Sequence, residues 1–263
     1  MHPIGRKTIS YLLAIKISIL LSFQSSFATQ VITPQTIKSE EIIQKTTPLL
    51  KEQFRKKKLV YGAPIFIRIF KESLELELWV KNGRKFKLFK TYYICDLSGS
   101  LGPKIREGDR QAPEGFYRVG PDQLNPWSNH HLSFNLGFPN EYDLAYQRTG
   151  SGLMVHGKCN SRGCFAMTNF RIEEIYTIAD NAILHGQESF PVHIFPFRMT
   201  RQNLKKHPGK WSSFWKNLKE GYDFFEKTSI PPYTSVENCR YKFTSIPPLI
   251  ISTDFPEEQV CIE

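Results

Sequence analysis

A period of two residues, which begins just after Pro64, most limits the folds open to this chain. The isoleucines of 65–69 stand at every second position, and so do the leucines of 74–78. The dipeptide Asn82-Gly83, typical of a two-residue hairpin turn, then precedes a further apolar stretch at 86–89. Alternate side chains of a strand point to opposite faces, so the pattern predicts two strands, a turn and a third strand. We therefore expect a mainly β (α+β) fold.

Weaker signals place further elements around this hairpin. Short apolar stretches predict strands at 116–119, 131–135 and 191–197. The period becomes helical after Asn169, a residue type that favours the N-cap position. A second helical pattern consists of large side chains that we expect to pack on the β body: Trp211, Phe214, Trp215, Leu218, Tyr222 and Phe225.

The first 28 residues have the features of a secretory signal. Basic residues precede the apolar stretch 9–23, no acidic residue occurs before Glu40, and Ser26 and Ala28 fit a small-x-small cleavage site. We expect residues 1–28 to be removed on export, which leaves the mature protein in the periplasm or cell envelope. No apolar run of the mature chain approaches the roughly 18 residues of a membrane span.

The mature chain divides into three segments. Residues 29–60 are expected to be a lead-in with one or two short helices, because Pro48 interrupts its apolar pattern. Residues 61–197 form the β body. Residues 198–263 form a helical and Pro-rich C-terminal extension, in which prolines predict an irregular tail over about the last 35 residues.

The composition is that of an ordinary globular chain, with 40% hydrophobic and 23% charged residues, and it excludes collagen-like and wholly disordered chains. Lys and Arg number 35 against 25 Asp and Glu. Removal of the three basic residues of the signal leaves 32 − 25 = +7. This surplus predicts an anionic neighbourhood. Export favours an envelope polymer or lipid headgroups over nucleic acid.

The cysteines number five, so in an exported chain at least one thiol has no intramolecular partner. If one thiol is kept for chemistry, the other four allow three pairings, and the sequence does not choose among them. One candidate pair is Cys95 with Cys159, since both fall near the same loop region. The five are Cys95, Cys159, Cys164, Cys239 and Cys261.

The segment 154–167 carries the residues best suited to chemistry, because His156 and Cys164 stand within nine residues of each other. A free thiol is mostly protonated at neutral pH, and a neighbouring imidazole can remove its proton to make a thiolate nucleophile. Gly163 would allow a sharp turn beside the sulfur. Backbone N–H groups of that turn, including that of Cys164, could then face a developing oxyanion.

Two other interpretations of this segment remain open from the residues alone. The first is a structural role, in which Cys159 and Cys164 form a disulfide. The second is a zinc site made of His156, Cys159 and Cys164 with a fourth ligand from His130, His131 or Asp143. The segment lacks a second Cys-x-x-Cys or His-x-x-x-His pair, which weighs against zinc.

The same residues resemble a known family. His156-Gly157 followed by Ser161-Arg162-Gly163-Cys164 resembles the HG…SxGC signature of the L,D-transpeptidase catalytic family, also called the YkuD family. The stretch Leu101–Tyr117, LGPKIREGDRQAPEGFY, is similar to that family's GDxxTPxGxY segment. Segments 132–140 and 148–151 resemble its YafK (DpaA)-like branch. The resemblance covers about residues 60–197.

The resemblance implies a β-sandwich catalytic domain at 61–197, in an exported enzyme of the cell wall. Cys164 matches the nucleophile, His156 the general base and acid, and Gly163 the glycine before the nucleophile. The implied substrate is a peptidoglycan stem peptide, attacked through a thioester acyl-enzyme without a metal or organic cofactor. The branch resembles a hydrolase that releases a lipoprotein from peptidoglycan. Transfer and hydrolysis, as an amidase or L,D-carboxypeptidase, therefore both stay open, and a non-catalytic wall-binding module is the alternative of another class.

The chain departs from the family pattern directly after the nucleophile. Many members have Ile-Arg or Val-Arg there, whereas this chain has Phe165-Ala166. We hypothesise that Arg148 or Arg110 supplies the missing cation for a substrate carboxylate, since an arginine fork matches a carboxylate.

Overall fold

The structure is a computed structural model that describes residues 31–247 and 261. The expected export signal lies outside the described residues. None of the helices in the described part is both long and apolar enough to span a bilayer.

The hairpin predicted from the period-two pattern is part of a five-stranded sheet, with strand order β3-β2-β1-β10-β5. Strand β1 pairs in parallel with β10, and the other neighbours are antiparallel. Gly83 takes a positive φ of 63° in the turn between β2 and β3, a conformation that glycine adopts without steric cost. The strands are β1 (Ile65–Phe70), β2 (Glu75–Asn82), β3 (Lys85–Tyr93), β5 (Gly115–Val119) and β10 (Phe190–Phe195).

A second five-stranded sheet has the order β4-β9-β8-β7-β6. Strands β8 and β9 run parallel, and the remaining pairs are antiparallel. Phe134 of β7 meets Phe190 of β10 edge to face at 5.5 Å, so the two sheets share one core. The strands are β4 (Asp96–Leu97), β6 (Leu124–Asn125), β7 (Ser133–Asn135), β8 (Met154–His156) and β9 (Phe165–Ala166); a short 3-10 helix, η1 (Pro121–Gln123), precedes β6. The expected α+β fold with a β-sandwich is confirmed.

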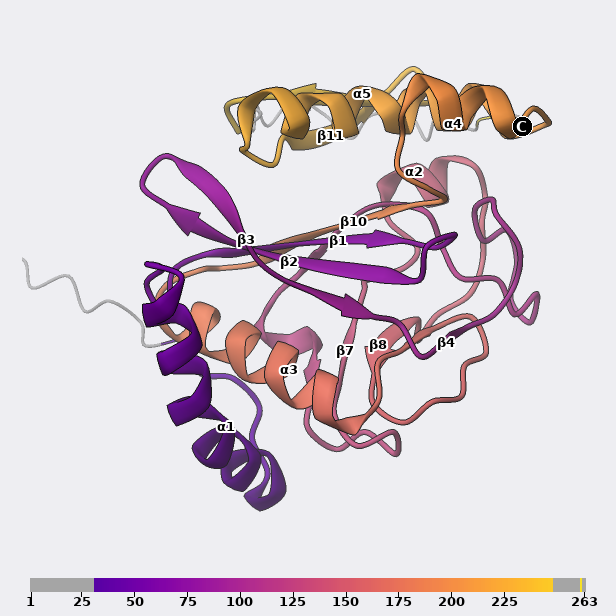
Figure 1. Ribbon diagram of the computed structural model, residues 1–263. Coiled ribbons are helices and arrows are strands. Elements are labelled where there is room, and N and C mark those ends of the chain that lie inside the picture. The colour runs from indigo at the N-terminus through magenta and orange to yellow at the C-terminus, as the bar shows by residue number, and fades with distance from the viewer. Residues whose placement is uncertain (1–30, 248–260, 262–263) are drawn as a thin grey trace, which may run out of the picture. The chain divides into compact units, whose positions relative to one another are not determined.

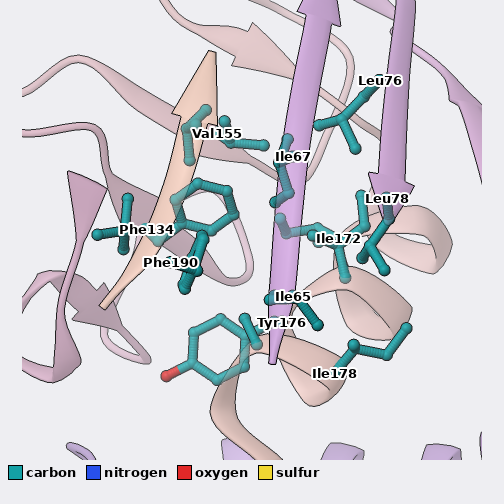
Figure 2. Packing of buried hydrophobic residues seen from close by; sticks show 14 of the residues in the cluster. Ile65, Ile67, Leu76, Leu78, Phe134, Val155, Ile172, Tyr176, Ile178 and Phe190 are labelled. Carbon is teal, nitrogen blue, oxygen red and sulfur yellow. The ribbon is translucent and has the colours of Figure 1, made fainter. Parts of the chain in front are cut away.

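Strand β1 is buried on both faces, which explains why it is apolar except at Arg68, whose guanidinium binds the Glu77 carboxylate at 2.8 Å. Its isoleucines join a core cluster with the second sheet and with α3 (Asn169–Leu184). Figure 2 shows Ile65 and Ile67 among Phe134, Val155 and the side chains of α3. The alternate residues of β1 face α5 (Ser212–Thr228), and Phe66 lies 4.9 Å from Phe225. Figure 1 shows α3 and α5 on opposite sides of this sheet.

The lead-in forms one helix, α1 (Ile37–Lys56), where the sequence predicted one or two short helices. Pro48 lies inside it, and the Thr47 hydroxyl donates to the carbonyl of Ile43 one turn earlier. Leu50 and Phe54 are buried in the core cluster on the C-terminal side of the proline. Their burial holds the helix together although Pro48 lacks an N–H.

The C-terminal extension is more regular than its prolines indicate. It contains α4 (Arg201–Lys206), α5 and a hairpin of β11 (Tyr233–Glu237) and β12 (Arg240–Thr244). Asn238 and Cys239 both have positive φ, 49° and 59°, which is the geometry of a tight hairpin turn. The expectation of an irregular tail is therefore wrong for this part, while residues 248–260 lie outside the description. The predicted aromatic stripe of α5 packs on Phe70, Phe116 and Phe195, as expected.

The remaining helix, α2 (Glu141–Ala145), follows a capping residue that links two parts of the chain. Asn140 accepts the N–H of Asp143 at 2.9 Å and donates to the hydroxyl of Tyr241 at 2.9 Å. It thereby joins α2 to the C-terminal hairpin.

Candidate active site

The parallel pairing of β8 with β9 brings His156 and Cys164 to one face of the second sheet. Val155 pairs with Phe165, and His156 pairs with Ala166. One step back along the register, the Met154 N–H lies 3.4 Å from the Cys164 Sγ. Because side chains alternate along a strand and paired residues share a face, the imidazole and the thiol project to the same side.

The loop between the two strands is fixed at several points. A disulfide joins Cys159 to Cys95, the residue before β4, which confirms that candidate pairing. The Ser161 N–H donates to the Asp96 carboxylate at 2.7 Å. The Gly163 N–H donates to the Ser98 hydroxyl at 2.5 Å. The loop is therefore clamped to the edge strand of its own sheet, which holds the thiol in place.

His156 is 4% exposed, and its Nδ1 lies 2.6 Å from the carbonyl oxygen of Gly157. A carbonyl can only accept, so Nδ1 carries the proton and Nε2 keeps a lone pair. Burial is the main cause that lowers the pKa of His156; the nearby His130 ring lowers it further, while the Gly157 bond and Asp96 raise it. The imidazole is thus neutral near pH 7 and can act as a base.

Cys164 is the one free cysteine among the described residues and is partly exposed. Burial raises the pKa of its thiol, against the opposing effects of the Met154 N–H and the positive charge of Lys104. The resting state is therefore a neutral thiol beside a neutral imidazole. Such a thiol needs a base to become a nucleophile, which is the role that His156 is poised to fill.

The backbone N–H groups of the turn are already engaged. Ser161 Oγ accepts the Cys164 N–H at 3.0 Å and donates to the Cys164 carbonyl at 2.7 Å, and Ser98 holds the Gly163 N–H. The expectation that the Cys164 amide faces an oxyanion does not hold in this structure, because the serine at the third position before the cysteine competes for it. Gly163 keeps its expected turn conformation, with φ 91°.

A cavity of about 560 Å³ opens beside the sulfur. Its volume is in the range of small-molecule and peptide sites. Cys164 and His156 both line it, so the structure brings the two predicted catalytic side chains to one cavity. Its other lining residues include Met154, His130, Trp127 and Arg162.

The structure does not bring Arg148 or Arg110 to this cavity. Arg148 is 3% exposed and binds the buried carboxylate of Asp143 at 3.0 Å, below a ring of aromatic side chains. Arg110 is exposed, and its carbonyl accepts the Ser98 hydroxyl. The cation that does line the cavity is Arg162, which the sequence analysis quoted only as part of the signature. The sequence feature that could have identified Arg162 is its position next to Gly163, two residues before Cys164.

The two other interpretations of this segment, a Cys159–Cys164 disulfide and a zinc site, are contradicted by the partners that these residues have. Cys159 pairs with Cys95, so it forms no disulfide with Cys164 and offers no thiolate to zinc. Asp143 pairs with Arg148, and His131 lies 2.6 Å from Glu173 of α3. The proposed zinc ligand set is therefore not assembled. In residues 31–247 and 261, no group of three His, Cys, Asp or Glu side chains is arranged to hold a metal ion.

Lys104 is a second residue that the sequence analysis did not single out. It is 4% exposed, and its Nζ donates to Asp109 at 2.5 Å and to the carbonyl of Arg106 at 2.8 Å. Its charge is near enough to lower the pKa of Cys164. Nothing local in the sequence indicates this role, because the loop that carries Lys104 meets the sulfur only in the folded chain.

Comparisons with known proteins relate this chain to a family of cell-wall enzymes by sequence. A family model described as the L,D-transpeptidase catalytic domain (YkuD) matches residues 66–194. The chain is 49% identical over 197 residues to "Putative L,D-transpeptidase YafK" of Escherichia coli K12, an alignment that covers 74% of this chain and 79% of that protein. Among solved structures, the helical cell shape determining protein Pgp2 of Campylobacter jejuni matches with a TM-score of 0.42 and 18% identity, over 65% of this chain and 72% of its own. Bd1075 of Bdellovibrio bacteriovorus matches with a TM-score of 0.38 and 21% identity, over 67% and 78%.

Proposed function

The chain belongs to the L,D-transpeptidase catalytic (YkuD) family, and from that premise we propose that it is a cysteine acyltransferase acting on peptidoglycan stem peptides. One observation carries the proposal: a free thiol, Cys164, and a buried neutral imidazole, His156, line the same cavity. A binding module would need neither the base nor the free thiol.

In the first half-reaction, His156 Nε2 takes the proton of the Cys164 thiol as the sulfur attacks a substrate carbonyl. By the family resemblance, this carbonyl belongs to the L-centre of diaminopimelate. The C–N bond then breaks, and the proton on His156 passes to the leaving amine. The product is a thioester on Cys164, and the charges balance because the proton only moves from sulfur to nitrogen.

In the second half-reaction, an incoming nucleophile gives its proton to His156 and attacks the thioester. The sulfur leaves as thiolate and recovers the proton, which restores the starting enzyme. An amine as nucleophile gives transpeptidation, and water gives hydrolysis as an amidase or L,D-carboxypeptidase would, for example to release a lipoprotein from peptidoglycan. Both outcomes use the same residues, so they are distinguished by product.

Arg162 is the residue that we assign to the substrate carboxylate. It is exposed, it lines the cavity, and it is two residues from the nucleophile. A guanidinium fork binds a carboxylate through two N–H donors. This assignment replaces Arg148, whose guanidinium is committed to Asp143, and Arg110, which does not line the cavity.

The proposed place of action is the periplasm, after removal of residues 1–28. Three features support it: the signal-like N-terminus, the net positive charge and two disulfides, Cys95–Cys159 and Cys239–Cys261. Disulfides persist in oxidising compartments such as the periplasm. A positive surface favours approach to an anionic envelope.

The test is to incubate the purified mature protein with defined tetrapeptide muropeptides and to separate the products by mass. New cross-links identify transfer, and shortened stems or freed protein identify hydrolysis. Cys164→Ala should abolish both. Intact mass after carbapenem treatment should show a covalent adduct that Cys164→Ala lacks. Product formation by Cys164→Ala at the wild-type rate would exclude the mechanism, and wild-type binding to sacculi without turnover would indicate a binding module.

A further inference from the structure

We propose that the end of the catalytic cavity that carries Trp127 binds a sugar ring of the glycan strand to which the stem peptide is attached. This inference rests on the proposed function and names the part of the substrate that lies away from the sulfur. Trp127 is 66% exposed although it is among the largest apolar side chains in the protein. Among the exposed large hydrophobic residues of the described part, it alone lines this cavity.

Strand order sets the separation between Trp127 and the reacting sulfur. Cys164 precedes β9, and Trp127 follows β6, three strands away in the order β9-β8-β7-β6. Neighbouring strands lie about 4.8 Å apart, so β6 and β9 are separated by roughly 14 Å, and the loop after Trp127 returns over β8, where the His130 ring lies 4.5 Å from the His156 ring. The occupant of the Trp127 end is therefore a remote part of a long substrate.

The chemistry of this end favours a neutral, hydroxyl-rich ligand. Asn125, Ser128 and Asn129 line the cavity around Trp127, and each can both donate and accept hydrogen bonds. The only Lys or Arg among the lining residues is Arg162, at the opposite end beside the nucleophile. A carboxylate of the stem peptide would need a cation here. Sugar hydroxyl and N-acetyl groups instead match the amide and hydroxyl side chains.

The indole supplies the second half of such a site. The face of an aromatic ring is electron-rich and attracts weakly positive hydrogens. A pyranose ring presents C–H groups on its faces and hydroxyl groups at its edge. It can therefore stack on Trp127 while its edge bonds to the neighbouring side chains.

The loop that carries Trp127 is held in place before any ligand arrives. The backbone N–H of Trp127 donates to the side-chain oxygen of Asn125 at 3.1 Å, and the backbone N–H of His130 donates to the Ser128 hydroxyl at 3.1 Å. A Cβ at Gly157 would lie 2.6 Å from the His130 carbonyl oxygen, so the loop packs directly on the residue after the catalytic base. A fixed platform reduces the ordering cost of binding.

The test compares two substrates that share one stem tetrapeptide, one free and one attached to the N-acetylglucosamine–N-acetylmuramic acid disaccharide. We expect wild-type kcat/KM to be higher for the disaccharide substrate. Trp127→Ala should lower that value about tenfold, as expected for loss of one stacked ring, and should lower the value for the free tetrapeptide much less. Trp127→Phe should keep most of the preference. Phe170→Ala, at a residue 62% exposed but outside the cavity, is the matched control and should change neither value.

Equal wild-type values for the two substrates, or an equal loss on both in Trp127→Ala, would overturn the sugar site. If the wild type turns over neither substrate, the proposed function fails, and direct binding then decides the sugar site alone. In that arm Cys164→Ala is titrated with an oligosaccharide of N-acetylglucosamine. Saturable binding that weakens about tenfold with Trp127→Ala supports the site, and its absence excludes it.

Discussion

His156 donates its Nδ1 proton to the carbonyl oxygen of Gly157, the next residue in the chain, across 2.6 Å. The bond fixes the tautomer with a backbone group that cannot itself titrate. Nε2 is thereby kept as the acceptor in the catalytic cavity, and no third ionisable residue is needed to orient the base.

The pH dependence of acylation should follow from the neutral imidazole of His156 and the neutral thiol of Cys164. Burial lowers the pKa of His156, so the base stays unprotonated below its ordinary value of 6.5. The acidic limb of kcat/KM should lie below pH 6.5, because protonation removes the base only there. Burial raises the pKa of Cys164, so uncatalysed ionisation of the thiol requires a pH above its ordinary 9.0. A pH profile of kcat/KM from 4.5 to 10 checks the position of the acidic limb and the effect of thiol ionisation at high pH.

His156→Ala is the control for that profile. It should lower kcat/KM by about 10²–10⁴-fold at pH 7 and remove the acidic limb. Alkylation of Cys164 in this variant should become fast only above the ordinary thiol range. An acidic limb that persists in His156→Ala would assign the titration to another group.

The Cys95–Cys159 disulfide should matter for both stability and activity. It closes a segment of 64 residues and clamps the loop before the nucleophile. The double variant Cys95→Ala/Cys159→Ala should lose about 2–4 kcal/mol in the free energy of unfolding, measured by urea denaturation. It should also lose activity, because only hydrogen bonds, such as that of the Ser161 N–H to Asp96, would then hold that loop beside β4.

The second disulfide provides the matched control. Cys239→Ala/Cys261→Ala removes a bridge across 22 residues in the C-terminal part of the chain. It should lower stability but leave kcat/KM of the folded enzyme near the wild-type value. Equal activity losses in the two double variants would contradict a positioning role for Cys95–Cys159.

Arg162→Ala should raise KM for stem peptides that carry a free carboxylate, by roughly three- to tenfold, with a smaller change in kcat, since an exposed charged hydrogen bond contributes modestly. Arg162→Lys should recover part of the loss. Arg110→Ala, which removes an exposed arginine outside the cavity, should leave KM unchanged. Amidation of the substrate carboxylate should abolish the difference between wild type and Arg162→Ala.

Arg148→Ala should act on stability. It leaves the Asp143 carboxylate buried without its cation, and such losses cost about 3–5 kcal/mol. Burial already raises the pKa of Asp143, against the opposing effect of Arg148, so removal of the arginine should raise this pKa further. The double variant Asp143→Asn/Arg148→Gln should be less destabilised than Arg148→Ala. A raised KM with unchanged stability in Arg148→Ala would instead restore its role as a substrate ligand.

His193 should make the protein less stable in mild acid. It is 2% exposed, packs edge to face against Phe66 and Phe116 at 4.6 Å, and burial holds its pKa well below 6.5. As pH falls through 6.5, the unfolded chain binds a proton at this position and the folded chain does not, so the free energy of unfolding falls. The slope is about 1.4 kcal/mol per pH unit for one such group.

His193→Phe removes that proton uptake. Urea unfolding at pH 7.5, 6.5 and 5.5 should therefore show a shallower loss in His193→Phe than in wild type. His185→Gln, at an exposed position, should keep the wild-type slope. An identical slope in His193→Phe would show that another group takes up the proton.

The sequence alone predicts those elements whose pattern is carried by residues close together in the chain. The strands at 65–89 followed from side-chain alternation, and the α5 stripe followed from helical spacing. Cys164 and His156 could be proposed as nucleophile and base because they lie eight residues apart in one segment. A chain whose base came from a distant element would not reveal the pair in this way.

Prediction failed where distant contacts override local preference. Pro48 should end a helix, but buried Leu50 and Phe54 carry α1 through it. The engagement of the Cys164 amide by Ser161 and of Arg148 by Asp143 depends on how loops fold back on each other. Trp127 gives no local signal either, since only the folded chain shows that it shares a cavity with the sulfur.

Any redesign of this segment must keep the parallel register of β8 and β9, because that register decides on which face of the sheet the thiol lies. An insertion between Cys159 and Asn160 keeps the Cys95–Cys159 bridge, lengthens the connection and leaves both strands in register. A deletion that slides β9 by a single residue would instead rotate the thiol to the underside of the sheet, away from its base, while the backbone ladder re-forms almost unchanged. The length of the β8–β9 connection can therefore change while the thiol stays on the face of its base, whereas a one-residue change of strand register separates the two side chains.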